Sequence, residues 1–322
     1  MNVKSRARIG AVIGTAALAL GAMAIPASAD TPPGDYRVLA GVGSDTTQDV
    51  VNGLGAAIDS GTLIASYNAT GTSPIKTRAT GCEIARPNGS SAGINALRNA
   101  VDNNTGCLDF ARSSRGVADS STNDLTWIPF GKDAVTFAVR GDSALPKALT
   151  KAQLVSVYTC ETTSLNGVAL TPLLPQSGSG TRSFFLGQLG LTEDTFGTCV
   201  DDTVQEHNGE ALDSAGDIAP YSVAQYIAQG NEIVDVIDRR GDAVLGSVDG
   251  AEPQLADGTL NVDFPFNRDV YNVVPTAKLT DPTLAAAFVG SASKVCAQTG
   301  VINTYGFGAI AACGSTGLKG ES

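Results

Sequence analysis

A stretch of small residues in the middle of the chain is the first candidate for binding chemistry. It reads Ser177-Gly178-Ser179-Gly180-Thr181-Arg182, and it joins a strand-like apolar run, 168–174, to apolar residues at helical spacing. We therefore place it at a helix N-terminus, where backbone N–H groups lack intrahelical partners and the helix dipole attracts negative charge. The hydroxyls of Ser179 and Thr181 and the guanidinium of Arg182 add donors that suit an oxyanion. A simple helix cap would use the same residue types.

Similar turns occur at three earlier places in the chain. Gly43-Ser44-Asp45-Thr46 follows an apolar strand-like run, and Gly89-Ser90-Ser91 opens a helical pattern. Arg112-Ser113-Ser114-Arg115 ends a short apolar strand. Open α/β sheets bind ligands at the carboxyl ends of their strands, so the recurrence favours anion binding over isolated caps.

The second turn also fits a catalytic motif, because residues 89–93 match the G-x-S-x-G of a hydrolase nucleophile elbow. This alternative would use Ser91 as nucleophile, His207 as base and Asp201 or Asp202 as the acid. A polar stretch precedes Gly89 where an elbow requires a buried strand, and 37 glycines make chance matches common. We therefore expect a protein that is not an enzyme, with His207 at the surface or bracing its polar loop.

The first 29 residues have the pattern of a secretory signal peptide. Lys4, Arg6 and Arg8 precede an apolar run, 9–25, and Ala27-Ser28-Ala29 offers a small-residue cleavage site. The mature chain would begin at Asp30, with no cysteine near that junction for a lipid anchor. No later apolar run approaches the roughly 20 residues that span a membrane. We expect a secreted protein, extracellular or at the cell surface.

Six cysteines in an exported chain favour disulfide bonds. Short loop closure favours pairs of sequence neighbours, although six cysteines allow 15 connectivities. Metal ligation is a weaker reading, since the chain has one histidine and no C-x-x-C pair. The expected pairs are Cys82–Cys107, Cys160–Cys199 and Cys296–Cys313, with no metal site.

Length and charge limit the possible folds and partners. The 322 residues, less the leader, are enough for two lobes. The formal net charge of −11 becomes more negative once the basic leader is removed, which argues against nucleic acid and anionic membranes as partners. Two long β-like runs, 127–139 and 264–274, are candidates for segments that cross between the lobes.

The four turns, in this order, resemble the phosphate-binding proteins of phosphate ABC importers, which are PstS-like. The resemblance implies an α/β, two-lobed fold of the periplasmic-binding-protein-like type II, in which each lobe is a mixed sheet flanked by helices and the ligand lies in the cleft between lobes. Lobe 1 would comprise residues 30–137 and 266–322, and lobe 2 residues 138–265. The expected ligand-binding residues are Asp45, Thr46, Ser90, Ser91, Ser114, Arg115, Ser179, Gly180, Thr181 and Arg182.

Two positions depart from that family's pattern. Ser114 stands where the family usually has an Asp that accepts the proton of hydrogen phosphate, and Pro175 stands where it has an Arg. Asp45 is our candidate for the acceptor, and Arg182, Arg115 or Arg112 would supply the positive charge. The departure leaves sulfate or another tetrahedral oxyanion open as the ligand.

The sequence thus predicts a secreted, monomeric solute-binding protein for inorganic phosphate or a similar oxyanion, with no cofactor. An ABC importer permease would be its partner in phosphate uptake. A surface adhesion or signalling protein on the same fold is the alternative from another functional class.

Overall fold

The computed structural model describes residues 30–321. The predicted signal peptide therefore lies outside the described residues. Among the residues described, no helix combines the length and the apolar character that a membrane crossing requires.

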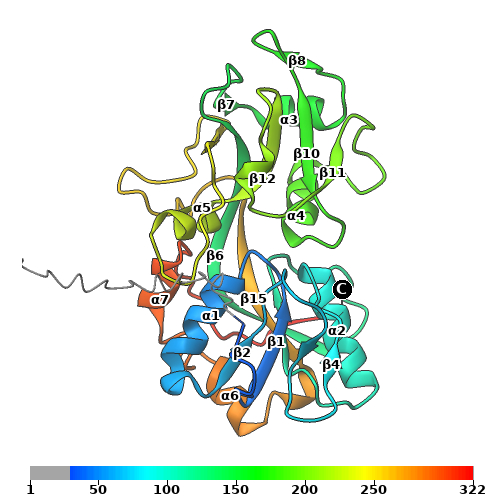
Figure 1. Ribbon diagram of the computed structural model, residues 1–322, viewed down its shortest axis with the longest axis vertical. Coiled ribbons are helices and arrows are strands. Elements are labelled where there is room, and N and C mark those ends of the chain that lie inside the picture. Colours follow the sequence, from blue (N-terminus) through cyan, green and yellow to red (C-terminus); the bar gives the residue numbers. More distant parts are fainter. Residues whose placement is uncertain (1–29, 322) are drawn as a thin grey trace, which may run out of the picture.

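Two long antiparallel strands form the spine of the molecule. They are β6 (Leu125–Arg140) and β15 (Asn267–Pro275), which pair from Asn267↔Ala134 to Pro275↔Leu125 with an irregularity between Val270 and Tyr271. Figure 1 shows both strands running through the middle of the molecule from one end toward the other. They correspond to the two crossing runs that we predicted, and their mostly buried, apolar residues explain why both read as continuous β segments.

The rest of the main sheet extends from both sides of this pair. The strand order is β11-β10-β12-β6-β15-β5-β1-β2. On the β15 side, which we call lobe 1, lie β5 (Phe110–Ser113), β1 (Leu39–Gly43) and β2 (Ile64–Ser66). On the β6 side, which we call lobe 2, lie β12 (Asp217–Ser222), β10 (Thr171–Pro175) and β11 (Asp201–Val204). Within each group the strands pair in parallel, so their carboxyl ends meet at one edge.

Helices cover the sheet in both lobes. Lobe 1 carries α1 (Gln48–Ala57), α2 (Ser90–Asp102), α6 (Pro282–Phe288) and α7 (Thr299–Thr304), with the 3-10 turns η1 (Ile58–Gly61) and η3 (Thr276–Lys278). Lobe 2 carries α3 (Lys151–Tyr158), α4 (Gly180–Leu189) and α5 (Val223–Gly230), with η2 (Gly209–Ala211). The remaining short strands are β3 (Ile75–Lys76), β4 (Glu83–Ile84), β7 (Ala148–Leu149), β8 (Ser164–Leu165), β9 (Val168–Ala169), β13 (Ala243–Leu245), β14 (Ser247–Val248) and β16 (Leu318–Lys319).

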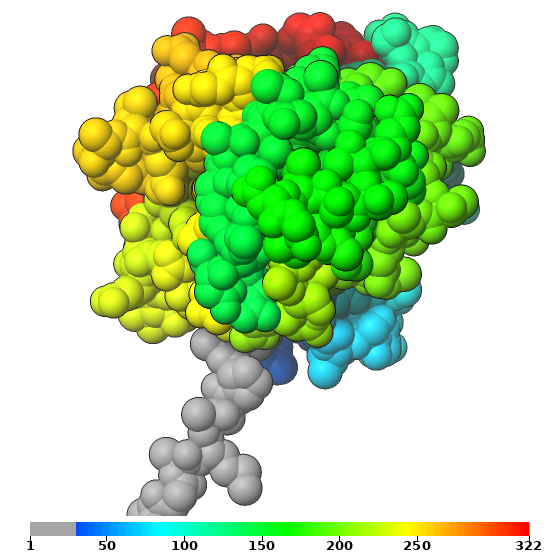
Figure 2. Space-filling view, turned by 90° about the horizontal axis from the view of Figure 1, so that it is seen from above, coloured from blue at the N-terminus to red at the C-terminus, as the bar shows by residue number. Residues whose placement is uncertain are grey.

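Each lobe has its own apolar core. In lobe 1, one cluster includes Leu54 on α1, Phe110 on β5 and Val270 on β15, and a second includes Trp127 and apolar residues of α2. In lobe 2, α3 and α4 pack on the sheet around Tyr158 and Phe185. Seen from the lobe 2 end, the green segments of that lobe form a continuous surface (Figure 2). Helix α5 contributes Ala224 and Ala228 to the lobe 1 cluster and Val223 and Ile227 to the lobe 2 cluster, so it connects the two cores alongside the crossing strands.

The fold is the two-lobed α/β architecture that the sequence predicted. The finer division at residues 137/138 and 265/266 stays a prediction. The six cysteines form Cys82–Cys107, Cys160–Cys199 and Cys296–Cys313. These are the pairs of sequence neighbours expected, and they close loops with separations of 25, 39 and 17 residues.

Candidate anion-binding site

Three helix N-termini and one strand end meet between the lobes. Helix α1 follows the turn 43–47, α2 begins at Ser90, α4 begins at Gly180, and β5 ends one residue before Ser114. The side chains that these ends contribute are all fully buried: Ser44, Thr46, Ser90, Ser114, Ser179 and Thr181. Predicted residues from four separate stretches of sequence thus come together at one place.

The hydroxyl of Thr46 lies at the centre of this group. Its Oγ1 is 3.2 Å from Ser114 Oγ and 3.1 Å from Thr181 Oγ1. The same oxygen is 2.9 Å from His207 Nε2 and 3.2 Å from Glu206 Oε2. Ser114 Oγ is also 3.3 Å from Ser90 Oγ, so the hydroxyls form one continuous hydrogen-bonded cluster.

The two lobes touch directly at this cluster. The Ser91 N–H donates to the Gly178 carbonyl over 3.2 Å, so an α2 N-terminal donor is satisfied from lobe 2. Any Cβ at Gly180 would overlap the hydroxyls of Ser90 and Ser114, so only glycine permits this close approach. Because the donors here bond to one another, an anion can reach them only after the lobes separate.

Ser179 and Arg182 also serve the helix itself. Ser179 Oγ accepts from the Arg182 N–H at 2.9 Å, which makes Ser179 the N-cap of α4. Ser179 therefore has the helix-cap role that the sequence also allowed.

Glu206 and His207 enter the site from the loop after β11, and both are buried. His207 Nδ1 accepts from the backbone N–H of Ser222 at 3.2 Å, so the neutral ring carries its proton on Nε2, which faces Thr46 and Glu206. Burial opposes the charge of Glu206, but the hydrogen bond from His207, aided by Ser179 and by the charge of Arg268, lowers its pKa below the ordinary value. Glu206 is therefore an ionised acceptor inside the cluster.

His207 was expected either at the surface or bracing its polar loop. The surface position is wrong, because the side chain is fully buried. The imidazole has polar partners on both sides, because it braces β12 through Nδ1 and faces the hydroxyls through Nε2. These bonds compensate the loss of hydration, which the local sequence could not reveal.

A buried ion pair between the crossing strands supplies positive charge. Arg268 on β15 donates Nε and Nη2 to Asp133 Oδ2 on β6, at 3.0 and 2.8 Å. Its Nη2 also lies 3.0 Å from Thr181 Oγ1. Asp133 is held on its other side by the Ser222 hydroxyl and the Ala224 N–H, at 2.9 and 3.0 Å. Arg268 carries no binding signal in the sequence, because it lies within a run whose pattern indicates only a β segment.

Several buried polar atoms in and beside the site have no hydrogen-bond partner among the described residues, including Asp45 Oδ1, Thr47 Oγ1 and Gln225 Oε1. Arg268 Nη1, a donor, and Glu206 Oε1, an acceptor, are also among them. Buried polar atoms are almost always paired, so unpaired ones require an explanation. A bound oxyanion that carries a proton would satisfy a donor and an acceptor together.

The arginines proposed from the sequence have other partners. Arg112 is buried and donates to the Ser66 hydroxyl and to the carbonyls of Gly43, Ser44 and Tyr67. Arg182 pairs with Glu193 at 2.6 Å and Asp202 at 3.0 Å. Arg115 Nη2 donates to Ser91 Oγ at 2.9 Å, and its guanidinium lies over the Trp127 ring. None of these three hydrogen-bonds to the hydroxyl of Thr46 or Thr181 in the described residues.

Asp45 is buried, and its hydrogen bond and ion pair are with residues outside the hydroxyl cluster. Its Oδ2 accepts from Gln205 Nε2 at 3.3 Å, and its Oδ1 lies 3.9 Å from Arg239 Nη2. Burial raises the pKa of Asp45, although the charge of Arg239 acts in the opposite direction. Glu206, which directly contacts Thr46, is better placed than Asp45 to accept a ligand proton.

The residues of the hydrolase alternative, Ser91 and His207, have other hydrogen-bond partners. Ser91 Oγ is bonded to Arg115, whereas the ring nitrogens of His207 contact Ser222, Thr46, Thr181 and Glu206. No hydrogen bond joins Ser91 to His207 within residues 30–321. In the same part of the chain, no group of three or more His, Cys, Asp or Glu side chains could hold a metal ion.

The fold and the interlobe cluster together define the class of protein. A profile of the PBP superfamily domain matches residues 30–292, and the chain belongs to the PBP superfamily. Its fold is the two-lobed type II form that the sequence resemblance implied.

Two solved structures are similar over nearly their whole length. One is described as a phosphate ABC transporter substrate-binding protein from Clostridium perfringens with bound phosphate. Its sequence is 16% identical and its TM-score is 0.60. The similarity covers 84% of this chain and 99% of that chain. The other is an ABC-type phosphate transport receptor from Vibrio cholerae, 16% identical, with a TM-score of 0.57 and coverage of 84% and 100%. At this identity the likeness concerns the fold. No curated protein sequence matches the chain.

Proposed function

We propose that this protein is a non-enzymatic solute-binding protein for inorganic phosphate. The observation that carries the proposal is the convergence of hydroxyls from both lobes on one buried arginine and one buried carboxylate. The two similar structures, whose descriptions name phosphate transport, support the same ligand class. We propose Thr46, Ser90, Ser114, Ser179, Gly180, Thr181, Glu206, His207 and Arg268 as the ligand-binding set.

Binding would proceed by separation and closure of the lobes. With the lobes apart, the hydroxyls of Thr46 and Ser114 on one side and Thr181 on the other exchange their mutual hydrogen bonds for bonds to the anion. The free N–H groups at the helix N-termini replace part of its water shell. Arg268 is the cation of the site, and its unpartnered Nη1 is available to the ligand.

The selectivity for phosphate over sulfate would come from Glu206. An ionised carboxylate accepts a hydrogen bond and cannot donate one, so it favours an oxyanion that retains a proton. Hydrogen phosphate has such a proton at neutral pH, and sulfate has none. An unprotonated anion would place like charges together in a buried site, which is unfavourable.

We further propose that the chain is exported, cleaved after Ala29, and delivers phosphate to an ABC importer permease as a monomer. Figure 1 shows the described chain as two lobes on shared strands, an arrangement suited to hinge closure. The acidic charge is consistent with a ligand held by local donors and not by the field of the whole molecule.

Calorimetric titration of anion-stripped protein with phosphate and then sulfate, from pH 5 to 8, tests the proposal. We expect phosphate to bind and sulfate to be excluded. Equal binding of both anions would contradict the role of Glu206, and binding of neither would leave the adhesion or signalling class.

A further inference from the structure

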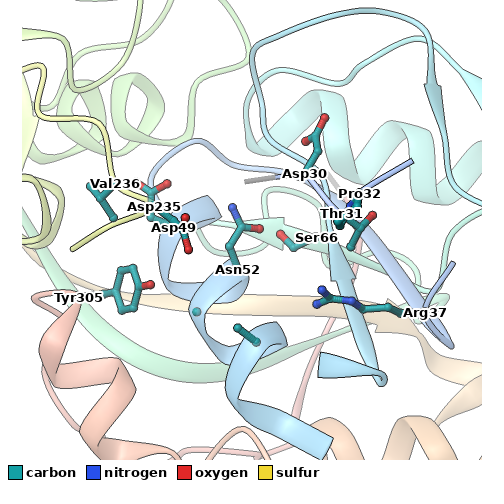
Figure 3. A pocket seen from close by; sticks show the side chains of 12 residues that line it. Asp30, Thr31, Pro32, Arg37, Asp49, Asn52, Ser66, Asp235, Val236 and Tyr305 are labelled. Atoms are coloured by element: carbon teal, nitrogen blue, oxygen red, sulfur yellow. The ribbon is translucent and has the colours of Figure 1, made fainter. Parts of the chain in front are cut away.

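The segment between α5 and β13, residues 231–242, connects the two lobes at a place outside the hydroxyl cluster. Its Ile233 and Val236 pack against an apolar cluster of lobe 1. Asp235 and Val236 also line, together with Asp49 of α1, a cavity of about 230 Å³ (Figure 3). The first part of the segment therefore lies against lobe 1.

Arg239, near the end of this segment, is fixed to lobe 2 through its backbone. Its carbonyl accepts from the Gly209 N–H at 2.7 Å, and its N–H donates to Gln229 Oε1 at 2.9 Å. Gly209 lies on η2, and a Cβ there would overlap the Arg240 carbonyl, so the chain passes very close to η2 at this point. The guanidinium of Arg239 is therefore carried by lobe 2.

This guanidinium faces a carboxylate of lobe 1. Arg239 Nη2 lies 3.9 Å from Oδ1 of Asp45, which is 1% exposed and directly precedes Thr46 in the turn before α1. Gln205, which follows β11, donates to Asp45 Oδ2 at 3.3 Å. Gln225 of α5 donates to the Thr46 carbonyl at 2.8 Å. Three side chains thus hold this turn from the other side of the lobe boundary.

The ion pair is only partly formed in this arrangement of the lobes. Asp45 Oδ1 and Arg239 Nε are both buried, and neither has a hydrogen-bond partner among residues 30–321. The distance of 3.9 Å between Nη2 and Oδ1 allows attraction between the charges but exceeds the length of a hydrogen bond. A further approach of the two groups would allow a charge-assisted hydrogen bond to the unpartnered oxygen.

The charges around Asp45 explain why lobe closure needs this arginine. Asp49 on α1 is 6% exposed, and Glu206 is another buried carboxylate that acts on Asp45. Burial raises the pKa of Asp45 and of Asp49, and the charge of Arg239 acts against that rise at both carboxyl groups. Arg112 also acts on both, but it belongs to lobe 1 and stays with them when the lobes separate. Closure without Arg239 would remove these carboxylates from water without adding a cation, which is unfavourable.

We propose that Arg239 and Asp45 form an electrostatic latch between the lobes, which stabilises the closed form and must break when the lobes separate. The proposal rests on the lobe movement put forward under Proposed function, and it gives Asp45 a role other than ligand contact. Because Asp45 adjoins Thr46, the latch also holds the turn that carries the central hydroxyl of the site. It would therefore slow the release of a bound anion.

Distance measurements between the lobes of anion-free protein test the latch. Nitroxide spin labels are attached as oximes to p-acetylphenylalanine in place of Asp102, at the end of α2, and Thr195, after α4; both positions are exposed, and the chemistry leaves the disulfides intact. Double electron–electron resonance then gives the populations of the closed and open arrangements. We expect Arg239→Gln and Asp45→Asn each to lower the ratio of closed to open protein at least fivefold.

The double variant shows whether the two residues act on each other. Asp45→Asn/Arg239→Gln should lower the ratio no further than the larger single effect, and effects that multiply would overturn the proposal. Arg239→Lys keeps the charge and should retain most of the closed form. If Arg239→Gln is unfolded by circular dichroism, Asp45→Asn decides alone. An unchanged ratio in the deciding variant would also overturn the latch.

Arg240→Gln is the matched control. It removes the same charge from the same segment, but Arg240 pairs with Asp238 at 2.8 Å and lies over the Tyr226 ring, both outside lobe 1. We therefore expect its ratio of closed to open protein to equal that of the wild type. A decrease as large as that in Arg239→Gln would mean that the total charge of the segment matters and that no specific latch exists.

The rate of phosphate release gives a second readout. Stopped-flow mixing of the phosphate complex with a fluorescent phosphate sensor should show release at least five times faster from Arg239→Gln and Asp45→Asn, and unchanged rates in both would overturn the latch. Failure of the wild type to bind phosphate would contradict the proposed function and leave the distance result in force. Unaltered distances with intact phosphate binding would contradict the latch alone, so the two proposals fail separately.

Discussion

The hydroxyl oxygens of Thr46 and Thr181 lie 3.1 Å apart although 135 positions separate the two residues in the chain. One comes from the turn before α1 in lobe 1 and the other from the first turn of α4 in lobe 2. This pair marks where the two lobes meet, and in the proposed binding mode a ligand would come between its members. The contact therefore connects lobe closure to ligand binding.

Thr181→Val should weaken phosphate binding by about ten- to a hundredfold. Valine keeps the shape of threonine and removes one hydroxyl donor, and a hydrogen bond to a charged group is worth about 1.5–3 kcal/mol. Calorimetric titration measures the loss. Thr299→Val, at an exposed position in lobe 1, is the control and should leave the affinity unchanged. An unaltered affinity in Thr181→Val would mean that the turn serves only as the start of α4.

Glu206→Gln should reduce the preference for phosphate over sulfate. The amide can donate to an unprotonated oxygen, which the carboxylate cannot do, so sulfate gains a partner and hydrogen phosphate loses its acceptor. We expect the ratio of the two affinities to fall by at least tenfold in competition titrations. Asp45→Asn is the matched variant, and if it alone changed the ratio, Asp45 and not Glu206 would be the acceptor.

Arg268→Gln should abolish tight anion binding and destabilise the fold by about 3–5 kcal/mol. The substitution leaves the Asp133 carboxylate, which is 0% exposed, without its ionic partner. Urea denaturation measures the loss of stability. The double variant Asp133→Asn/Arg268→Gln should recover much of the stability while anion binding stays lost. Recovery of binding in that variant would show that Arg268 acts only as a structural ion pair.

The stabilising effect of Glu206 should depend on pH in a defined direction. Its pKa in the folded protein lies below the ordinary value of 4.5, so the folded state binds its proton less readily than the unfolded state does. The resulting stabilisation is fully present above 4.5 and is lost as the pH falls through the lower folded-state value. Thermal unfolding of the wild type and E206Q should therefore differ by a constant amount at neutral pH and converge in acid. A gap that widened in acid would require a raised pKa.

Removal of the Cys160–Cys199 bridge should lower the free energy of unfolding by about 4 kcal/mol in Cys160→Ser/Cys199→Ser. The bridge closes the longest of the disulfide loops in the described chain, with a separation of 39 residues, and the restriction of the unfolded chain grows with loop length. Cys296→Ser/Cys313→Ser, with a separation of 17, should cost about 3 kcal/mol. Denaturant titration under non-reducing conditions measures both values. Full stability in either double variant would contradict the expected contribution.

Local sequence patterns were enough to predict the binding turns, the fold class and the cysteine pairs. The four turns were recognisable because each combines small hydroxyl residues with the start of a helix or the end of a strand, and both features depend on neighbours in sequence. The two-lobed fold class followed from the order of those turns and is confirmed by the match to the PBP superfamily. The cysteine pairs likewise join sequence neighbours, which short loop closure favours.

The charged residues at the centre of the site could not be predicted from local sequence patterns. Arg182 lies in the most suggestive turn, yet its guanidinium pairs with Glu193 and Asp202. Arg268 lies in a β run with no binding signature, and it becomes the cation of the site only because β15 pairs with β6 beside Thr181.

The sequence by itself determined the turns that could hold an anion and favoured the cysteine pairs, because helix starts, strand ends and short loops depend on residues close together in the chain. Only the tertiary structure decided which charges face the site. Glu206 and His207 reach Thr46 across 160 and 161 positions, and Arg268 lies 135 positions from Asp133. Such contacts depend on how two lobes and two crossing strands pack together, and that packing leaves no periodic pattern in the sequence.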